Sequence, residues 1–401
     1  MISSHLWLKL RDFVFSILLI ITMLFPSSIN GNQSAQLVMI QFMLAMSLII
    51  VFFLSFCRIS KFSLLCSFVI LSLYLLFTLS SEYTDYAIGH ALAVLPILIL
   101  TTLRIKSSLG IKPLIRVYYL ITLVVFILAY SHFYSPLLSD LMLKFYAGGY
   151  DGLASNFKER LIPVSIFVSH SYAAFFYFTI LFVSWFLFSN GVNRLLNLLI
   201  VVLSLISTFL LLSGSGYFFV LYSFIFMFST LILKKSKNYL FLTMKVVFSF
   251  LVLFLILLYG VQIIPDLVER IIGDSGNGLL SRYVDGVLKE NVNYIANNPV
   301  VGLGFSFSDN YYYTDSDYIV MALRLGLIGS LLFFLTIFLF LNFNLNITLI
   351  FKLFFVFSIF IFMVSMPLSL YQRAVPFFIF FILFFRSFND KLNSRFDRAI
   401  K

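Results

Sequence analysis

The chain has 401 residues, of which 62% are hydrophobic and only 11% are charged, and its formal net charge is +11. An average soluble domain is roughly half apolar and about a quarter charged, so this composition excludes a soluble globular protein, a disordered chain and a disulfide-rich secreted fold. A nucleic-acid-binding domain is excluded too, because the basic residues have another explanation, given below.

Twelve apolar stretches are long enough to cross the hydrocarbon core of a bilayer, which takes about 20 helical residues. The first has no small-residue cleavage site, so we expect a membrane helix and not a removed signal peptide. The sequence therefore predicts an all-α polytopic membrane protein with about twelve transmembrane helices in a single membrane domain, 1–401. The stretches lie near 12–29, 37–56, 62–80, 86–103, 117–132, 164–188, 195–212, 216–233, 240–264, 317–341, 347–366 and 374–388.

Basic residues give this arrangement an orientation. If the N-terminus is cytoplasmic and each span reverses the side, most Lys and Arg residues fall on the cytoplasmic side and most Asp and Glu residues fall outside. This distribution is the positive-inside pattern. We therefore expect both termini inside, and we interpret the basic excess as a topology signal.

Two external connections are much longer than the others, at about 133–163 and 265–316. Long loops in compact proteins are uncommon and are often functional. Both are predicted to face the same side, and they hold most of the external charges, including Lys158 and Arg160 in the first and Arg270 in the second. We expect any chemistry to occur there.

The second loop, 265–316, contains the pattern of an amphipathic helix. Arg282 and Lys289 share its polar face, and Pro299 disfavours helix in the residue before it, so the helix should end near Asn297. A helix of this kind is expected to lie on the membrane surface. Apolar residues recur at helical spacing at positions 284, 287, 288, 292 and 295.

The order of motifs around this helix resembles the Wzy-type O-antigen polymerases and the wider superfamily that includes the O-antigen ligases. After Arg282 and the helix come Asn-Pro-Val-Val-Gly-Leu-Gly at 298–304, Asp-Ser-Asp-Tyr at 315–318 and Arg-Leu-Gly-Leu-Ile-Gly at 324–329. The resemblance implies polymerisation of undecaprenyl-pyrophosphate-linked oligosaccharide repeat units by glycosyl transfer at the periplasmic face of a bacterial inner membrane. The sequence contains no metal-binding cluster, so we expect a reaction without a metal or another cofactor. The resemblance implies a chain-length regulator and a flippase of the same pathway as partners.

That chemistry needs cations for the diphosphate and a base for the acceptor hydroxyl. Arginine suits a diphosphate because its planar fork donates two hydrogen bonds, and a carboxylate can take the acceptor proton. Arg324 lies inside the tenth span, where an arginine is costly unless it is paired or lines a cavity. The alternatives are that Asp317 only caps the helix and that Arg324 only extends to the interface. We assign Asp315, Asp317 and Arg324 as candidate catalytic residues and Arg282, Arg160, Lys158, Arg373, Arg270 and Lys289 as candidate substrate-binding residues.

Two other functions are compatible with this sequence. In O-antigen ligases the corresponding external loop carries a histidine, whereas this chain has none after His170. A flippase for the lipid-linked repeat unit would have a similar number of spans, but a transporter is expected to hold charges near the bilayer midplane. We therefore predict a polymerase, with the ligase and the flippase as alternatives.

Overall fold

The computed structural model describes residues 4–26, 35–80, 87–106, 109–146, 157, 161–167, 169–233, 286, 288–306, 308–313, 316–371 and 373–400. This part of the chain is mostly helical, and its only strands form a two-stranded antiparallel ribbon. Contacts divide the chain into two compact units. Unit 1 contains Met1–Ser155 and Tyr294–Lys401, and unit 2 contains Asn156–Asn293.

Each predicted span coincides with a helix, except the one at 240–264, which lies outside the described residues. Six helices in the described part are long and apolar enough to cross a membrane, namely α2, α3, α5, α9, α11 and α16. An α-helical membrane protein is thus confirmed, whereas the twelve spans, their orientation and the single membrane domain stay predictions. The helices at the predicted spans are α1 (Ser4–Leu24), α2 (Ala35–Phe56), α3 (Lys61–Ser80), α4 (Ala87–Thr101), α5 (Ile111–Ala129), α9 (His170–Ser189), α10 (Arg194–Leu210), α11 (Gly214–Leu233), α16 (Asp317–Asn344), α17 (Leu349–Ser365) and α18 (Ala374–Ile400).

Short helices occupy parts of both predicted external loops. The first loop contains α7 (Pro136–Tyr146), directly after the short α6 (Ser131–Tyr134). The second contains α15 (Lys289–Asn297), which ends where the proline at 299 predicts. The helix starts later than predicted, because Gly286 and Leu288, which the sequence pattern places inside it, are not helical and α15 begins at Lys289. Arg282 itself lies outside the described residues.

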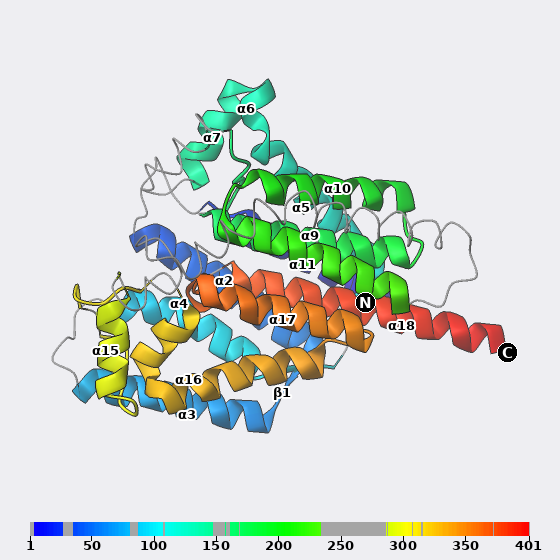
Figure 1. Cartoon of the computed structure of the whole chain (residues 1–401). Helices are drawn as coiled ribbons and strands as arrows, with labels where there is room; N and C mark the ends of the chain where they lie inside the picture. The colour runs from blue at the N-terminus through cyan, green and yellow to red at the C-terminus, as the bar shows by residue number, and fades with distance from the viewer. Residues whose placement is uncertain are drawn as a thin grey trace. The chain divides into compact units, whose positions relative to one another are not determined.

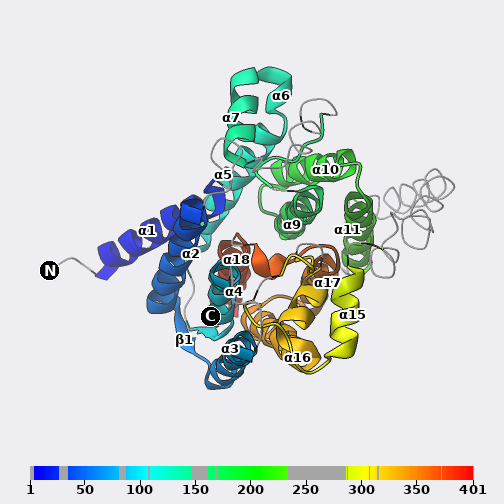
Figure 2. The ribbon, with the colours of Figure 1, turned by 90° about the vertical axis from the view of Figure 1, so that its left-hand side faces the viewer.

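Unit 2 is a bundle of α9, α10 and α11, which lie side by side (Figure 1, Figure 2). Aromatic side chains fill the contact between α9 and α11, where the rings of Phe182 and Phe226 stack at 4.7 Å. The indole Nε1 of Trp185 donates a 2.6 Å hydrogen bond to the Thr230 hydroxyl. This hydrogen bond pairs two buried polar groups between neighbouring membrane helices.

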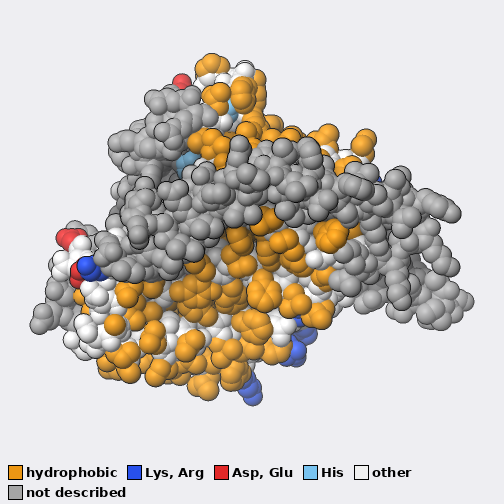
Figure 3. Space-filling view, in the orientation of Figure 1, with side chains coloured by type: hydrophobic (Ala, Val, Ile, Leu, Met, Phe, Trp, Pro, Cys, Tyr) orange, Lys and Arg blue, Asp and Glu red, His pale blue; other side chains and the backbone are white. Residues whose placement is uncertain are grey.

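Unit 1 buries an aromatic core between α17 and α18 and exposes aliphatic and aromatic side chains outside. The Phe355 ring of α17 lies 4.9 Å from the Phe381 ring of α18. Leu331 of α16 and Phe357 of α17 are 69% and 57% exposed. The hydrophobic surface visible in Figure 3 is what a lipid-facing exterior requires.

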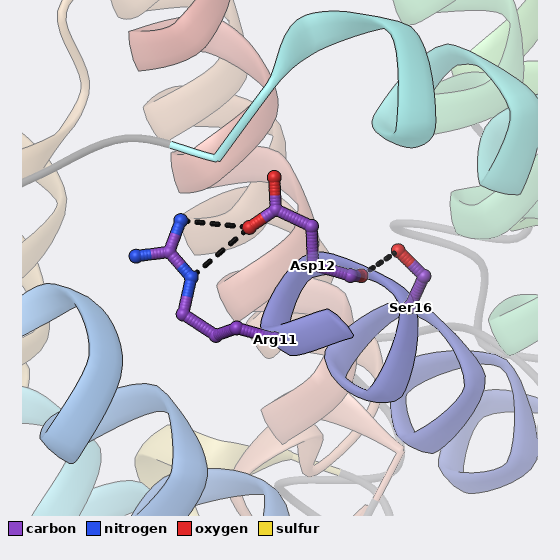
Figure 4. A network of polar contacts seen from close by, with 3 residues as sticks. All are labelled: Arg11, Asp12 and Ser16. Atoms are coloured by element: carbon purple, nitrogen blue, oxygen red, sulfur yellow. Dashed lines mark hydrogen bonds and ion pairs between the residues drawn. The ribbon is translucent and has the colours of Figure 1, made fainter. Parts of the chain in front are cut away.

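The α1 helix carries an ion pair between adjacent residues. Arg11 binds the Asp12 carboxylate at 2.7 Å, and the Ser16 hydroxyl donates to the Asp12 carbonyl (Figure 4). The Arg11 guanidinium also lies over the Phe56 ring, 4.7 Å from its centroid. The pair neutralises one of the few acidic residues on the side predicted to be cytoplasmic.

The ribbon pairs β1 (Cys57–Ile59) with β2 (Leu103–Ile105), and the sequence did not predict it. The side chain of Asn344, at the end of α16, fastens it. Its Oδ1 accepts from the Ile105 N–H at 2.9 Å, and its Nδ2 donates to the Leu103 carbonyl at 3.2 Å. The ribbon therefore joins the α2–α3 and α4–α5 connections to α16.

We expect Asn344→Leu to destabilise the protein by about 1–3 kcal/mol, because it leaves the buried Ile105 N–H without an acceptor. The thermal unfolding midpoint of the detergent-solubilised protein measures this effect. Asn346→Leu is the control, because Asn346 is exposed just beyond the helix. An equal midpoint for the two variants would contradict the fastening role of Asn344.

Candidate functional site

Helix α16 is broken at Gly326, and the Asn-Pro-Val-Val-Gly-Leu-Gly motif packs against the break. Gly326 has φ +65° and ψ 177°, so the helical hydrogen bonds are interrupted there. The Leu303 and Gly304 N–H groups donate to the carbonyls of Leu323 and Arg324 at 2.8 and 2.9 Å. On the other side of the break, the Leu327 N–H donates 2.8 Å to the carbonyl of Pro299. Unsatisfied backbone groups are very costly in a bilayer, so the motif stabilises the break.

Glycines are required where the two segments meet. A Cβ added to Gly302 would lie 2.2 Å from the Arg324 carbonyl oxygen, and one on Gly326 would lie 2.3 Å from that of Val300. Gly326 and Gly304 also have positive φ, which residues with a side chain rarely adopt. The two glycine motifs noted in the sequence are thus two halves of one backbone contact.

Helix α3 supplies the third side of this contact. The Thr78 hydroxyl accepts a 2.6 Å hydrogen bond from the Phe305 N–H and donates to the Tyr74 carbonyl. The rings of Tyr74 and Phe305 stack at 4.3 Å. Sequence reasoning missed Tyr74 and Thr78, because a hydroxyl within an apolar span is common and gives no signal of its partner.

Arg324 lies at the centre of this arrangement and is 1% exposed. Its Nη1 donates to the carbonyl of Gly304 at 3.0 Å and to the carbonyl of Ser306, and its guanidinium lies 4.5 Å from the centroid of the Tyr313 ring. Burial raises the pKa of the Tyr313 hydroxyl, an effect that the Arg324 charge partly offsets. Tyr313 therefore stays neutral at physiological pH and presents its ring face to the cation.

The other edge of the Arg324 guanidinium is unused. Among the described residues, neither Nε nor Nη2 has a hydrogen-bond partner, although both atoms are buried. Nε and Nη2 together form the side-on edge with which arginine binds a carboxylate or phosphate through two parallel bonds. Arg324 is thus oriented by two backbone carbonyls and keeps its bidentate edge available for an oxyanion.

Asp317 is fully buried at the start of α16 and binds a different part of the chain. Its carboxylate accepts a 3.0 Å hydrogen bond from the Ser369 N–H and another from the Ser369 hydroxyl. Ser369 belongs to the short 3-10 helix η1 (Leu368–Leu370) between α17 and α18. Asp317 does not form an ion pair with Arg324. It makes no capping hydrogen bond that the structure records, and the geometry favours a tether between α16 and the α17–α18 connection.

We expect Asp317→Asn to keep near-normal stability, because the amide can still accept from the Ser369 N–H and donate to its hydroxyl. Asp317→Leu should destabilise the protein by about 1–3 kcal/mol, since it leaves the buried Ser369 N–H unpaired. The thermal unfolding midpoint of the detergent-solubilised protein measures both variants. A midpoint of Asp317→Asn as low as that of Asp317→Leu would contradict the tether.

Arg373, predicted to bind substrate, is 7% exposed just before α18. Its Nη1 donates 3.1 Å to the Tyr371 hydroxyl and its Nη2 donates to the Phe25 carbonyl, while its guanidinium lies 5.2 Å from the centroid of the Tyr146 ring. It also borders a small pocket at the ends of α1 and α2. Arg373 thus connects these helices to α7 and the start of α18. The other residues lining the pocket are Thr22, Phe25, Gln41 and Leu44.

The remaining predicted site residues are only partly described. Lys289 is exposed in the first turn of α15, on the polar face that the sequence predicts. The apolar face of α15 packs through Tyr294 and Ile295 against a buried cluster of Leu303, Tyr313 and Leu323. Arg282, Arg160, Lys158, Arg270 and Asp315 lie outside the described residues, and their roles stay predictions.

Comparison of the chain with known protein families, with curated proteins and with solved structures gives no match. In the part of the chain that the structure describes, no group of three or more His, Cys, Asp or Glu side chains could hold a metal ion. The functional assignment therefore depends on the geometry around Arg324 and on the resemblance of the sequence motifs.

Proposed function

We propose that the protein polymerises undecaprenyl-pyrophosphate-linked oligosaccharide repeat units by glycosyl transfer. The observation that carries the proposal is the buried Arg324 side chain, whose bidentate edge has no partner among the described residues. Catalysis with a diphosphate leaving group needs fixed cationic donors where negative charge grows. Arg324 fits that requirement, because the carbonyls of Gly304 and Ser306 fix the direction of its guanidinium.

In the proposed reaction, a hydroxyl on the non-reducing sugar of one lipid-linked unit attacks the anomeric carbon of the donor's diphosphate-linked sugar. A glycosidic C–O bond forms, the bond from that carbon to the diphosphate oxygen breaks, and undecaprenyl pyrophosphate leaves with the electron pair. Arg324 binds the leaving diphosphate, with Arg282 as a second cation. The acceptor proton passes to a carboxylate, and Asp315 is the preferred candidate, because hydrogen bonds from Ser369 engage the carboxylate of Asp317.

A flippase for the same lipid-linked unit is the second candidate, and the broken helix favours it. Transporters commonly bind their substrates at discontinuous membrane helices, and α16 is interrupted at Gly326, two residues from the buried Arg324. Both candidates bind a lipid diphosphate, so binding alone does not separate them. The products that accumulate in the cell separate the two candidates.

A lipopolysaccharide gel from a strain lacking the gene tests the proposal. A polymerase defect should leave lipid cores capped with one repeat unit and no ladder of longer chains. Loss of every antigen-bearing band, including the single unit, would overturn the polymerase assignment in favour of a flippase or a ligase. Restoring the ladder with the intact gene is the control.

A further inference from the structure

The ribbon formed by β1 and β2 presents two arginines side by side on one face. Arg58 and Arg104 are direct partners in the antiparallel ladder. Directly opposed residues project from the same face, with Cβ atoms about 4.5–5.5 Å apart. Both side chains are exposed, whereas Leu103 and Ile105 on the other face are 5% and 4% exposed. The face opposite the arginines is therefore buried on β2, whereas Ile59 of β1 is 50% exposed, and the outer face of the ribbon carries two charges.

Like charges directly opposite each other destabilise a ladder, and no acidic side chain among the described residues compensates this pair. In the described ranges, no carboxylate lies within ion-pair distance of Arg58 or Arg104. Hydrogen bonds at both ends of the ribbon also keep the two arginines next to each other. The Ser60 N–H donates 2.8 Å to the Thr102 carbonyl, and the Lys106 N–H donates 2.7 Å to the Phe56 carbonyl. An anion bound between the two guanidinium groups would convert this repulsion into attraction.

The ribbon lies where a charged surface meets the lipid-facing surface. Phe62, at the start of α3, and Phe343, at the end of α16, are 57% and 53% exposed, and the Arg104 guanidinium lies 5.6 Å from the centroid of the Phe343 ring. Figure 3 shows basic side chains along the edge of the hydrophobic surface, near β1 in Figure 1. Exposed aromatic residues next to paired cations match the level of phospholipid headgroups.

We propose that Arg58 and Arg104 bind the phosphate group of an anionic phospholipid, whose acyl chains lie along the exposed apolar side chains of α3 and α16. Each guanidinium can donate two hydrogen bonds to phosphate oxygens. A lipid is favoured over a free phosphate because the charged pair adjoins the apolar exterior. The charge distribution predicts this end to be cytoplasmic, so the lipid belongs to the inner leaflet.

Titration of the detergent-solubilised full chain with phosphatidylglycerol, followed by native mass spectrometry, tests the proposal. Because each of the two guanidinium groups loses its charge-assisted hydrogen bonds to the phosphate, Arg58→Gln with Arg104→Gln should weaken binding by roughly 30-fold or more. The control is Lys112→Gln with Arg116→Gln, which removes two exposed charges from the same predicted side but outside the proposed site. Salt screens such charges, so binding should change less than about 3-fold. Without lipid, the thermal unfolding midpoint of the Arg58/Arg104 variant should be no lower than that of the wild type, because the variant lacks the repulsion between the two arginines.

Three results would overturn this assignment. Unchanged phosphatidylglycerol binding in the Arg58/Arg104 variant would exclude the pair as its site. An equal loss in the control variant would reduce the effect to diffuse surface charge. Displacement of the lipid by low millimolar inorganic phosphate would mean that the pair binds phosphate without a lipid.

Discussion

Arg324→Lys is expected to abolish the polymer ladder while the protein accumulates normally. Lysine can still donate to the carbonyls of Gly304 and Ser306, which the arginine binds through Nη1. It cannot present the bidentate edge, and loss of one transition-state donor typically costs about 10²–10³ in rate. The measurement is polymer formation from purified lipid-linked repeat units, together with the lipopolysaccharide ladder in cells.

Arg116→Lys is the matched control, because Arg116 is exposed on α5 and should tolerate the same exchange. Binding of a short-chain prenyl diphosphate to the purified protein gives a second readout, which should fall in Arg324→Lys even if other steps limit the assay. A normal ladder and unchanged diphosphate binding in Arg324→Lys would remove Arg324 from the site.

Gly302→Ala is expected to have the largest effect on folding. The new Cβ would lie 2.2 Å from the Arg324 carbonyl oxygen and 2.6 Å from the Leu325 nitrogen, both of them backbone atoms. Relief requires moving the turn away from α16, which breaks its hydrogen bonds to Leu323 and Arg324. We expect a loss of about 3 kcal/mol or more in the free energy of unfolding.

The amount of folded protein and its thermal unfolding midpoint in detergent measure this loss. Gly214→Ala is the control, because no atom lies within 4 Å of the added Cβ, and it should change stability by less than about 1 kcal/mol. Equal midpoints for the two variants would show that the turn does not pack tightly on the broken helix.

The sequence predicted the helices well, because membrane spans depend on length and hydropathy, which are local properties. It also predicted the end of the surface helix, since Pro299 acts on its immediate neighbour. The β1–β2 ribbon was missed because each strand has only three residues and its partner lies across two helices. The break in α16 was missed for a related reason, since an isolated glycine in an apolar span does not reveal its φ.

The site was predicted in part. Arg324 was selected because a charge inside a span is costly, and the structure gives it two carbonyl partners and an aromatic ring. The partner of the Asp317 carboxylate was not predictable. Asp317 lies two turns earlier on the same helix, yet its carboxylate binds Ser369, 52 residues away in the sequence. Contacts of this kind depend on how distant helices pack, which periodicity does not encode.

Unit 1 is built from two segments that are separated in the sequence by unit 2, so it can be completed only late in synthesis. Thr78 and its partner Phe305 are separated by 227 residues, and Asn344 is made 239 residues after Ile105. At about 5–20 residues per second, α3 must wait roughly 10–50 s in the membrane before the segment that covers its polar end is translated. Unit 2 is synthesised during that interval. A chain interrupted before residue 294 therefore contains the first segment of unit 1 without the second segment that packs against it. We expect membrane proteases to degrade such a chain.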